Sequence, residues 1–312
     1  MDNLLLSFNV IAPLLLMLAV GIFLRKVNFV DEHVTKKMNR LVALFLLPLL
    51  VFKNIYNAEI EELMNFNVLL YAFVGIVLEF LIATVLSFIL TKEPKRRGVM
   101  IQGMFRCNYV IFGIPIAVSL YGDEGSAVTA VLTIVVIPAL NILAVFALEL
   151  FNGNKISAKF IFKKIVTNPL IIASLLGMFF SFTKIELPGL IYKPLSDLAS
   201  TATPMAFVFL GASLSIREMK GHIKELMFTV FTRLVLFPII FITVAILLGF
   251  KDAWLVALLT VFASPTAVSS YSLAETLGGD GKLAGNIVVF TTAFSIVTMF
   301  LWVLVLKSIG VF

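Results

Sequence analysis

The sequence predicts an all-α membrane protein with ten transmembrane helices, arranged as two inverted five-helix repeats. Hydrophobic residues make up 61% of the 312 residues and charged residues only 13%, with a mean hydropathy of +1.08. A soluble protein of this length could not cover its surface with so little charge. Apolar stretches of about 20 residues, long enough to cross a bilayer as a helix, recur along the chain. The alternating pattern of a membrane barrel is absent, so the spans are expected to be helical.

The first repeat, residues 1–151, contains five expected spans. The first lacks a basic region before it and a small-residue cleavage site after it, so it is interpreted as a retained span and not a signal peptide. The third span carries Glu79 near its centre, and the fifth carries Pro138 and Asn141. The spans cover about residues 8–24, 38–56, 67–90, 98–120 and 126–149.

The second repeat, residues 166–312, follows a polar linker at 152–165 that contains four lysines and is expected to be cytoplasmic. Its seventh span contains Thr203-Pro204, and its eighth contains Arg233. The spans cover about residues 166–182, 194–214, 226–249, 253–276 and 283–306.

Prolines at matching positions indicate that the halves are related. Pro13 and Pro48 each recur 156 residues later, and Pro115 recurs 150 residues later as Pro265. Because each half has an odd number of spans, the second half would enter the membrane from the opposite side. The repeats are therefore expected to be inverted, about an axis in the membrane plane.

The distribution of basic residues predicts the orientation. Seventeen of the 24 lysines and arginines follow spans 1, 3, 5, 7 and 9, and only five lie on the other side. Cytoplasmic loops carry the excess of Lys and Arg. Both termini are thus expected outside a plasma (inner) membrane. The net charge of +6 then reflects topology, and no nucleic-acid partner is expected.

Spans 4 and 9 are both expected to be broken helices. Both contain the pattern Pro-x-Ala-Val-Ser, within 115–119 and 265–269. Proline removes a backbone donor, and the freed groups need partners inside protein or in a wet cavity. The breaks are expected at Gly113-Ile114-Pro115 and at Ser264-Pro265-Thr266. Interrupted spans in matching halves point to a transporter binding site near the bilayer midplane, where the two spans would cross.

Arg106 and Asn108, just before the first expected break, are the leading candidates for binding a ligand. A charge at this depth is costly unless it is paired or wetted. The functional interpretation of Arg106 is an anion-binding or gating residue; the alternatives are a structural ion pair or a side chain that reaches the cytosolic interface. The half-helix ends add backbone donors that suit carboxylates. The alternative is that both breaks are packing kinks, with hydroxyls bonded back to the helix.

Other polar residues inside the spans have two open interpretations each. Glu79 and Arg233 lie 154 residues apart at equivalent repeat positions, which suggests a charge pair or a proton site at Glu79, or else two charges satisfied locally. Asn39 is either a substrate residue or an interfacial cap. Four further residues on spans 5 and 10 either line the cavity or hold helices together: Asn141, Thr133, Thr291 and Thr292.

The sequence offers no sign of an enzyme. It contains no metal-ligand cluster and no arrangement of a nucleophile with a base, and no cofactor is expected. Cys107 is the single cysteine, so an intrachain disulfide is impossible. Beside Asn108 it is interpreted as a small packing residue. His33 and His222 lie in expected loops.

Two motifs resemble the auxin efflux carrier family. Residues 39–52, Asn-Arg-Leu-Val-Ala-Leu-Phe-Leu-Leu-Pro-Leu-Leu-Val-Phe, resemble the second span of those carriers. Arg106-x-Asn108 with Gly113-Ile114-Pro115 and Tyr121-Gly122 resembles the fourth span of the bacterial members, which include malate-type permeases. The resemblance covers the whole chain. It implies transport of organic anions, mostly carboxylates, a scaffold made of spans 1, 2, 6 and 7, a transport domain made of spans 3–5 and 8–10, and a homodimer formed through the scaffold.

These observations together predict a secondary transporter in the lipid bilayer that moves small organic anions by alternating access. The absence of a nucleotide motif disfavours a primary pump. One alternative is a sodium-coupled symporter of the bile-acid type, which sodium dependence of uptake would distinguish. The other is a membrane sensor that binds a ligand without moving it, which would show no counterflow in proteoliposomes.

Overall fold

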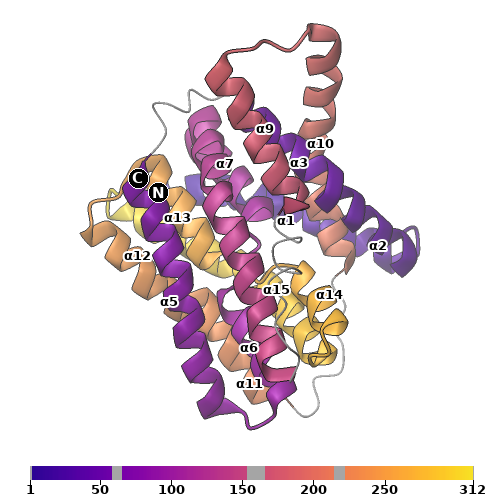
Figure 1. Ribbon diagram of the computed structural model, residues 1–312, viewed down its shortest axis with the longest axis vertical. Helices are drawn as coiled ribbons and strands as arrows, with labels where there is room; N and C mark the ends of the chain where they lie inside the picture. Colours follow the sequence, from indigo (N-terminus) through magenta and orange to yellow (C-terminus); the bar gives the residue numbers. More distant parts are fainter. Residues whose placement is uncertain (1, 58–64, 153–165, 214–221, 312) are drawn as a thin grey trace.

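The computed structural model describes residues 2–57, 65–152, 166–213 and 222–311, and within these ranges the chain is helical, with no β-strand (Figure 1). Two short π-helical segments, η1 and η2, lie within otherwise α-helical runs. In chain order the elements are α1 (Asp2–Lys26), α2 (Glu32–Leu41), η1 (Val42–Leu46), α3 (Leu47–Tyr56), α5 (Phe66–Leu90), α6 (Pro94–Phe105), α7 (Tyr109–Asn152), α9 (Pro169–Thr183), α10 (Gly189–Ser213), α11 (Ile223–Phe231), η2 (Thr232–Leu236), α12 (Phe237–Leu247), α13 (Asp252–Ala263), α14 (Ser269–Thr276) and α15 (Gly281–Ser308). The expected linker at 152–165 lies almost entirely outside the described residues.

Four helices begin directly after an Asp or Asn residue whose side chain caps the first turn. Asp31, Asn65, Asn168 and Asp280 precede α2, α5, α9 and α15, and each side chain accepts a hydrogen bond from a backbone N–H two or three residues later. The first N–H groups of a helix have no partner within it, and Asp or Asn at this position satisfies one of them.

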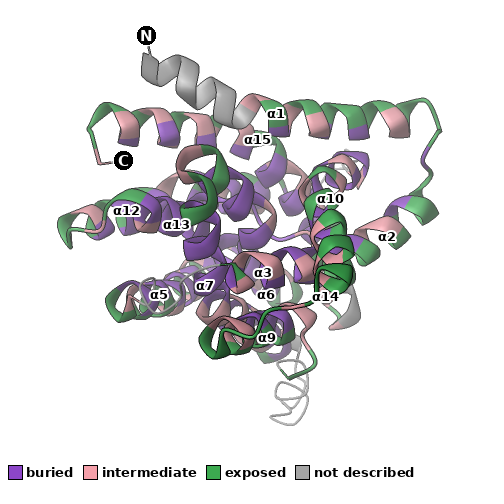
Figure 2. Cartoon of the chain, turned by 90° about the horizontal axis from the view of Figure 1, so that it is seen from above, coloured by how far each residue is buried: buried purple, intermediate pink, exposed green. Residues whose placement is uncertain are grey.

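Several helices are suited to a membrane. Within the described ranges, six helices are long and apolar enough to cross a membrane. Two further apolar helices are shorter, Pro169–Thr183 and Asp252–Ala263. The outer face of α5 exposes Leu81, Val85 and Phe88, and Figure 2 shows exposed residues along the outer sides of α5 and α12 while buried ones gather between α6, α7 and α13. A large exposed apolar surface of this kind is what a lipid-facing helix presents. The protein is therefore a multi-pass membrane protein. The six long helices are Glu32–Tyr56, Phe66–Leu90, Tyr109–Phe151, Gly189–Ser213, Ile223–Leu247 and Gly281–Ser308.

The long helix α7 is two arms joined by a reversal at Gly122. This glycine has φ 57° and ψ −137°, outside the helical region, and such a backbone conformation favours glycine. A Cβ atom added to Gly125 would lie 2.3 Å from the carbonyl oxygen of Ala117. In a straight helix, residues eight apart are separated by about 12 Å along the axis. The chain therefore folds back here. The arm after Gly122 is long enough to account for the fifth expected span, whereas the shorter arm before it covers only the second part of the fourth expected span, whose first part is α6.

Two sets of helices pack among themselves on either side of α7. In Figure 1, α2, α3, α9 and α10 lie on one side and α5, α12 and α13 on the other. The first set is joined by α1, which packs on α10. The α1–α10 contact is a backbone contact: a Cβ on Gly21 would lie 1.8 Å from the Val208 carbonyl oxygen, and one on Gly211 would lie 2.1 Å from that of Leu18. Small residues permit such close approach of membrane helices.

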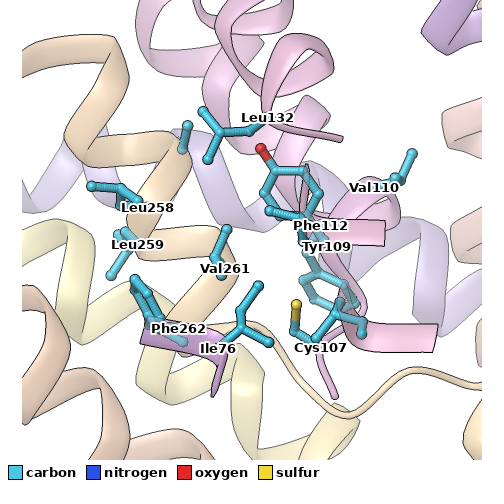
Figure 3. Packing of buried hydrophobic residues seen from close by; sticks show 14 of the residues in the cluster. Ile76, Cys107, Tyr109, Val110, Phe112, Leu132, Leu258, Leu259, Val261 and Phe262 are labelled. Carbon is cyan, nitrogen blue, oxygen red and sulfur yellow. The ribbon is translucent and has the colours of Figure 1, made fainter. Parts of the chain in front are cut away.

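The second set encloses an apolar core around the middle of the molecule. Figure 3 shows Tyr109 and Phe112 of α7 near Val261 and Phe262 of α13, with Ile76 of α5 beside them. All five are buried. This core surrounds the point where two helices are interrupted, and it fixes the position of the candidate site.

Candidate functional site at the helix crossing

Two interrupted helices cross and pair through their backbones. The first interruption separates α6 from α7, and the second separates α13 from α14. The Asn108 N–H donates to the Pro265 carbonyl oxygen at 2.7 Å, and the Ala267 N–H donates to the Arg106 carbonyl oxygen at 3.0 Å. Cys107 and Thr266 form the antiparallel bridge between these two bonds. Each break thus supplies partners for the backbone groups that the other break frees, as a non-aqueous setting requires.

The first break does not lie where the sequence pattern predicts it. The expectation of Gly113-Ile114-Pro115 is wrong: these residues lie within α7, and the chain is interrupted at Arg106-Cys107-Asn108. A proline inside a helix removes only one hydrogen bond, which a buried helix can tolerate. At the crossing, by contrast, the chain must be extended, because the Asn108 N–H bonds sideways to the Pro265 carbonyl oxygen of the other interrupted helix. Gly113 serves packing, because a Cβ there would lie 2.9 Å from the Thr260 hydroxyl oxygen on α13.

The second break lies at Ser264-Pro265-Thr266, as expected from the sequence. Ser264 has φ −69° and ψ 155° and ends α13. The residue before a proline is pushed into the extended region, so Pro265 itself explains this interruption. The Thr266 hydroxyl donates to the Gly103 carbonyl oxygen of α6 at 2.7 Å, and its N–H donates to the Thr291 hydroxyl oxygen of α15 at 3.2 Å.

Arg233 binds the ends of both interrupted helices. Its side chain is fully buried, and its Nη1 lies 3.4 Å from both carboxylate oxygens of Glu79. The other donors reach main-chain carbonyl oxygens where α6 and α13 end. Those carbonyls carry the negative end of each helix dipole, so a guanidinium there is favourable. The distances are 2.7 Å from Nε to Ser264, 2.6 Å from Nη2 to Val261, and 3.3 Å from Nη1 to both Met104 and Phe105.

Arg233 lies in the π-helical segment η2, just before Pro238. Proline has no N–H to donate to the carbonyl oxygen four residues earlier, which belongs to Leu234. The Trp302 indole N–H donates to that oxygen at 3.3 Å. π-Helical turns within α-helices are frequent at functional sites, and this one holds Arg233 at the crossing.

Arg106 leaves the crossing toward a different set of partners. Its side chain is buried, with 7% of its surface exposed. Nη2 donates to the Asn141 Oδ1 at 2.9 Å, and Nη1 lies 3.5 Å from the Ser270 hydroxyl oxygen. Both partners are neutral. Within the part of the chain that the structure describes, no carboxylate forms an ion pair with Arg106. A buried guanidinium with neutral partners is costly, and an anion beside it would relieve that cost.

Asn108 stands at the start of the first arm of α7. Its carbonyl oxygen accepts from the Phe112 N–H at 3.2 Å, the first bond of that helix. Its side-chain Nδ2 is buried and has no hydrogen-bond partner among the described residues. The following N–H groups, from Tyr109 to Ile111, lie in the first turn, where a helix offers its positive end. Asn108 therefore adds an unused amide donor to a favourable electrostatic position.

A cavity of about 770 Å³ lies between the first arm of α7 and helices α1, α3 and α10. Of the predicted residues, it is lined by Ile114 and Pro115; Arg106, Asn108 and Asn141 are not among its lining residues. The structure thus divides the predicted site into a polar group at the crossing and an apolar wall along α7. Six of the polar lining residues are Lys53, Asn54, Asn57, Ser119, Asp123 and Glu124.

Asn39 lies elsewhere. Its Nδ2 donates to the Ser213 hydroxyl oxygen at 2.6 Å, which ties α2 to the end of α10. Thr133 bonds back to the Thr129 carbonyl oxygen of its own helix at 3.2 Å. The Thr292 hydroxyl is buried and has no partner within the described ranges.

Sequence reasoning did not single out Ser270, Lys53 or Asn54. Ser270 directly follows the Pro-x-Ala-Val-Ser pattern, so its position one turn past the break was a usable signal. In the sequence, Lys53 is only one of the five basic residues on the side opposite the basic loops. Its place on the cavity depends on how α3 packs beside α7, which no local pattern reveals.

Comparison with known proteins places the chain among transporters. The model of a family described as "Membrane transport protein" matches residues 6–303. The chain is similar to an uncharacterized transporter of Methanocaldococcus jannaschii, with 26% identity over 308 residues, covering 95% of this chain and 98% of the relative. It is also similar to an uncharacterized transporter of Methanothermobacter thermautotrophicus (22% over 311 residues, 96% and 98% covered). A protein of Rhizobium meliloti named "Putative malonate transporter" is 23% identical over 269 residues, with 84% of each chain covered.

Proposed function

Because the chain belongs to the membrane transport protein family, that of the auxin efflux carriers, we propose that it is a secondary transporter of small organic anions. The family consists of membrane transporters and not enzymes. The transport cycle is proposed to be alternating access around a site at the helix crossing. Carboxylates are the proposed substrates, in keeping with the name of the Rhizobium relative.

The observation that carries this proposal is the buried Arg106 with only neutral partners. Its Nη2 contact to Asn141 and its longer Nη1 contact to Ser270 leave donors of the guanidinium free to hold an anion. An arginine binds a carboxylate through two parallel hydrogen bonds, a geometry that lysine cannot reproduce. The unused Nδ2 of Asn108 would add a third donor. The proposed site thus offers charge, geometry and a nearby helix N-terminus.

The arrangement in the membrane is proposed as ten spans in two inverted repeats, residues 1–151 and 166–312, joined by a cytoplasmic linker at 152–165. Support comes from the two crossing interruptions and the reversal of α7 at Gly122. Helices α1–α3, α9 and α10 would form the scaffold, and α5–α7 with α11–α15 the transport domain. Both termini would face outside the plasma membrane, and two copies would associate through their scaffolds.

In this arrangement the crossing moves as a unit. Arg233 contacts both interrupted helices and Glu79 on α5, so three elements of the proposed transport domain are held together by one side chain. The cavity lies between that domain and the scaffold and would open to the outside. Sliding of the transport domain against the scaffold would close it there and expose the Arg106 side of the crossing to the cytoplasm.

Counterflow in proteoliposomes tests the proposal. Vesicles that contain the purified protein are loaded with unlabelled malonate and diluted into radiolabelled malonate, with potassium or sodium as the only cation. The expected result is transient accumulation of label in both salts, because Arg233 already supplies a positive charge at the carbonyl ends where an ion would bind. Accumulation only in sodium would favour a sodium-coupled symporter. Binding without accumulation would indicate a sensor, and neither binding nor exchange of malonate or other small carboxylates would overturn the proposal.

A further inference from the structure

We propose that the cavity between α3 and α7 contains a second anion subsite, in which Lys53 and Asn54 hold a substrate carboxylate. This inference rests on the proposed transport of organic anions. The subsite lies on the proposed scaffold side of the cavity, whereas Arg106 and Asn108 belong to the crossing. It would receive the anion before the anion reaches the crossing.

Lys53 is the basic side chain of this cavity. It is half-buried, and its Nζ lies 3.3 Å from the Ser200 hydroxyl oxygen of α10. None of the ion pairs formed by the described residues includes Lys53. A lysine ammonium carries three donors, and one neutral hydroxyl uses only one of them. The remaining donors and the charge are available to an anion in the cavity.

Asn54 supplies a second donor next to Lys53. Its Nδ2 is buried and has no partner in the described part of the chain. Buried amide groups are nearly always hydrogen-bonded, so this group lacks an acceptor that a carboxylate oxygen would provide. Asn57, the residue that follows the end of α3, already has a partner: it donates to the Tyr192 hydroxyl at 2.7 Å and accepts from it at 2.9 Å. That reciprocal pair ties the end of α3 to α10 and fixes the wall that carries Lys53 and Asn54.

The opposite wall explains why the anion would bind to α3. Asp123 and Glu124 also line the cavity, and both are exposed at the point where α7 reverses. Their carboxylates repel an anion and so disfavour binding along α7. The cavity volume of about 770 Å³ lies within the range of small-molecule sites. A small dicarboxylate would fit with one carboxylate on Lys53 and Asn54.

Calorimetric titration of malonate into the full-length protein in nanodiscs tests this subsite. Lys53→Met removes the charge and should weaken binding about tenfold, the range for a partly exposed charge-assisted bond. Lys53→Arg should retain most of the affinity, and Asn54→Leu should lose about threefold to tenfold. The matched control is Lys193→Met, which removes an exposed lysine of α10 that does not line the cavity and should bind like wild type. Malonamide, the neutral isostere, should not bind.

A second test looks for tighter binding, which a misfolded variant would not show. Asp123→Asn combined with Glu124→Gln removes the repulsion and should tighten malonate binding about twofold to fivefold. Wild-type affinity in Lys53→Met, or no tightening in the double variant, would overturn the subsite. If Arg106→Ala loses binding while Lys53→Met does not, the subsite fails and the proposed function stands. If the wild-type protein neither binds nor exchanges any carboxylate, both fail.

Discussion

Replacing Arg233 by glutamine should destabilise the protein strongly, because this one side chain satisfies acceptors on three helices. It contacts four main-chain carbonyl oxygens and both oxygens of Glu79, all at 2.6–3.4 Å. Each buried acceptor left without a partner costs about 1–3 kcal/mol, and breaking a buried ion pair costs about 3–5 kcal/mol. These terms overlap, since Glu79 is counted in both, and the glutamine amide can restore one or two bonds. We therefore expect a loss of about 3–5 kcal/mol in the free energy of unfolding.

A double-mutant cycle separates the ion pair from the carbonyl contacts. Glu79→Gln, Arg233→Gln and the double variant would be purified in the same detergent and unfolded by denaturant or heat. Each single variant strands one buried charge, and the double variant strands none. The double variant should recover about 0.5–3 kcal/mol relative to the sum of the single losses. Strict additivity would refute the idea that the two charges depend on each other. Wild-type stability in Arg233→Gln would refute the role of the guanidinium at the crossing.

Two further predictions concern helix packing and orientation. Gly211→Leu should separate α1 from α10 and cost about 1–3 kcal/mol or more of unfolding free energy, because a Cβ there would lie 2.1 Å from the Leu18 carbonyl oxygen in a well-packed contact; an unchanged unfolding midpoint would mean that the backbones do not touch. In a Cys107→Ser background, a membrane-impermeant maleimide should label Lys193→Cys in intact cells and Lys92→Cys only after permeabilisation, and the reverse pattern would invert the proposed topology.

Sequence reasoning predicted the helical membrane class and the second interruption because both have local causes. Apolar length alone identifies helices that cross a membrane. Pro265 acts on its own neighbour, so the end of α13 at Ala263 could be predicted without knowledge of the fold. The recognition of a transporter family likewise rests on short patterns around Asn39 and Arg106 that are present in the chain itself.

The first interruption could not be predicted from local pattern, because its cause lies far along the chain. Nothing in Arg106-Cys107-Asn108 excludes a helix, whereas Pro115 is the usual indicator of a break. The extended conformation at Asn108 is held by a bond to the Pro265 carbonyl oxygen, a partner more than 150 residues away. Tertiary pairing therefore outweighed local propensity.

The candidate site could likewise be predicted only where its features have local causes. The patterns around the breaks gave Arg106 and Asn108 as residues of the crossing, but not the direction of the Arg106 side chain toward Asn141. Asn39, chosen from a motif, instead joins α2 to α10 through Ser213. Such contacts depend on how helices from different halves pack, and periodicity along one helix carries no information about them.

The most direct test of the account is the affinity of Arg106 variants for malonate, measured by calorimetry in nanodiscs on proteins with unchanged thermal stability. Loss of a charge-assisted bond of about 1.5–3 kcal/mol predicts affinity about tenfold to hundredfold weaker in Arg106→Ala. Arg106→Lys, which keeps the charge and loses the two-pronged geometry, should lie between wild type and alanine, and Asn108→Ala should lose less than Arg106→Ala. Normal malonate binding and exchange by Arg106→Ala would show that the arginine is structural and that the anion does not bind at the crossing.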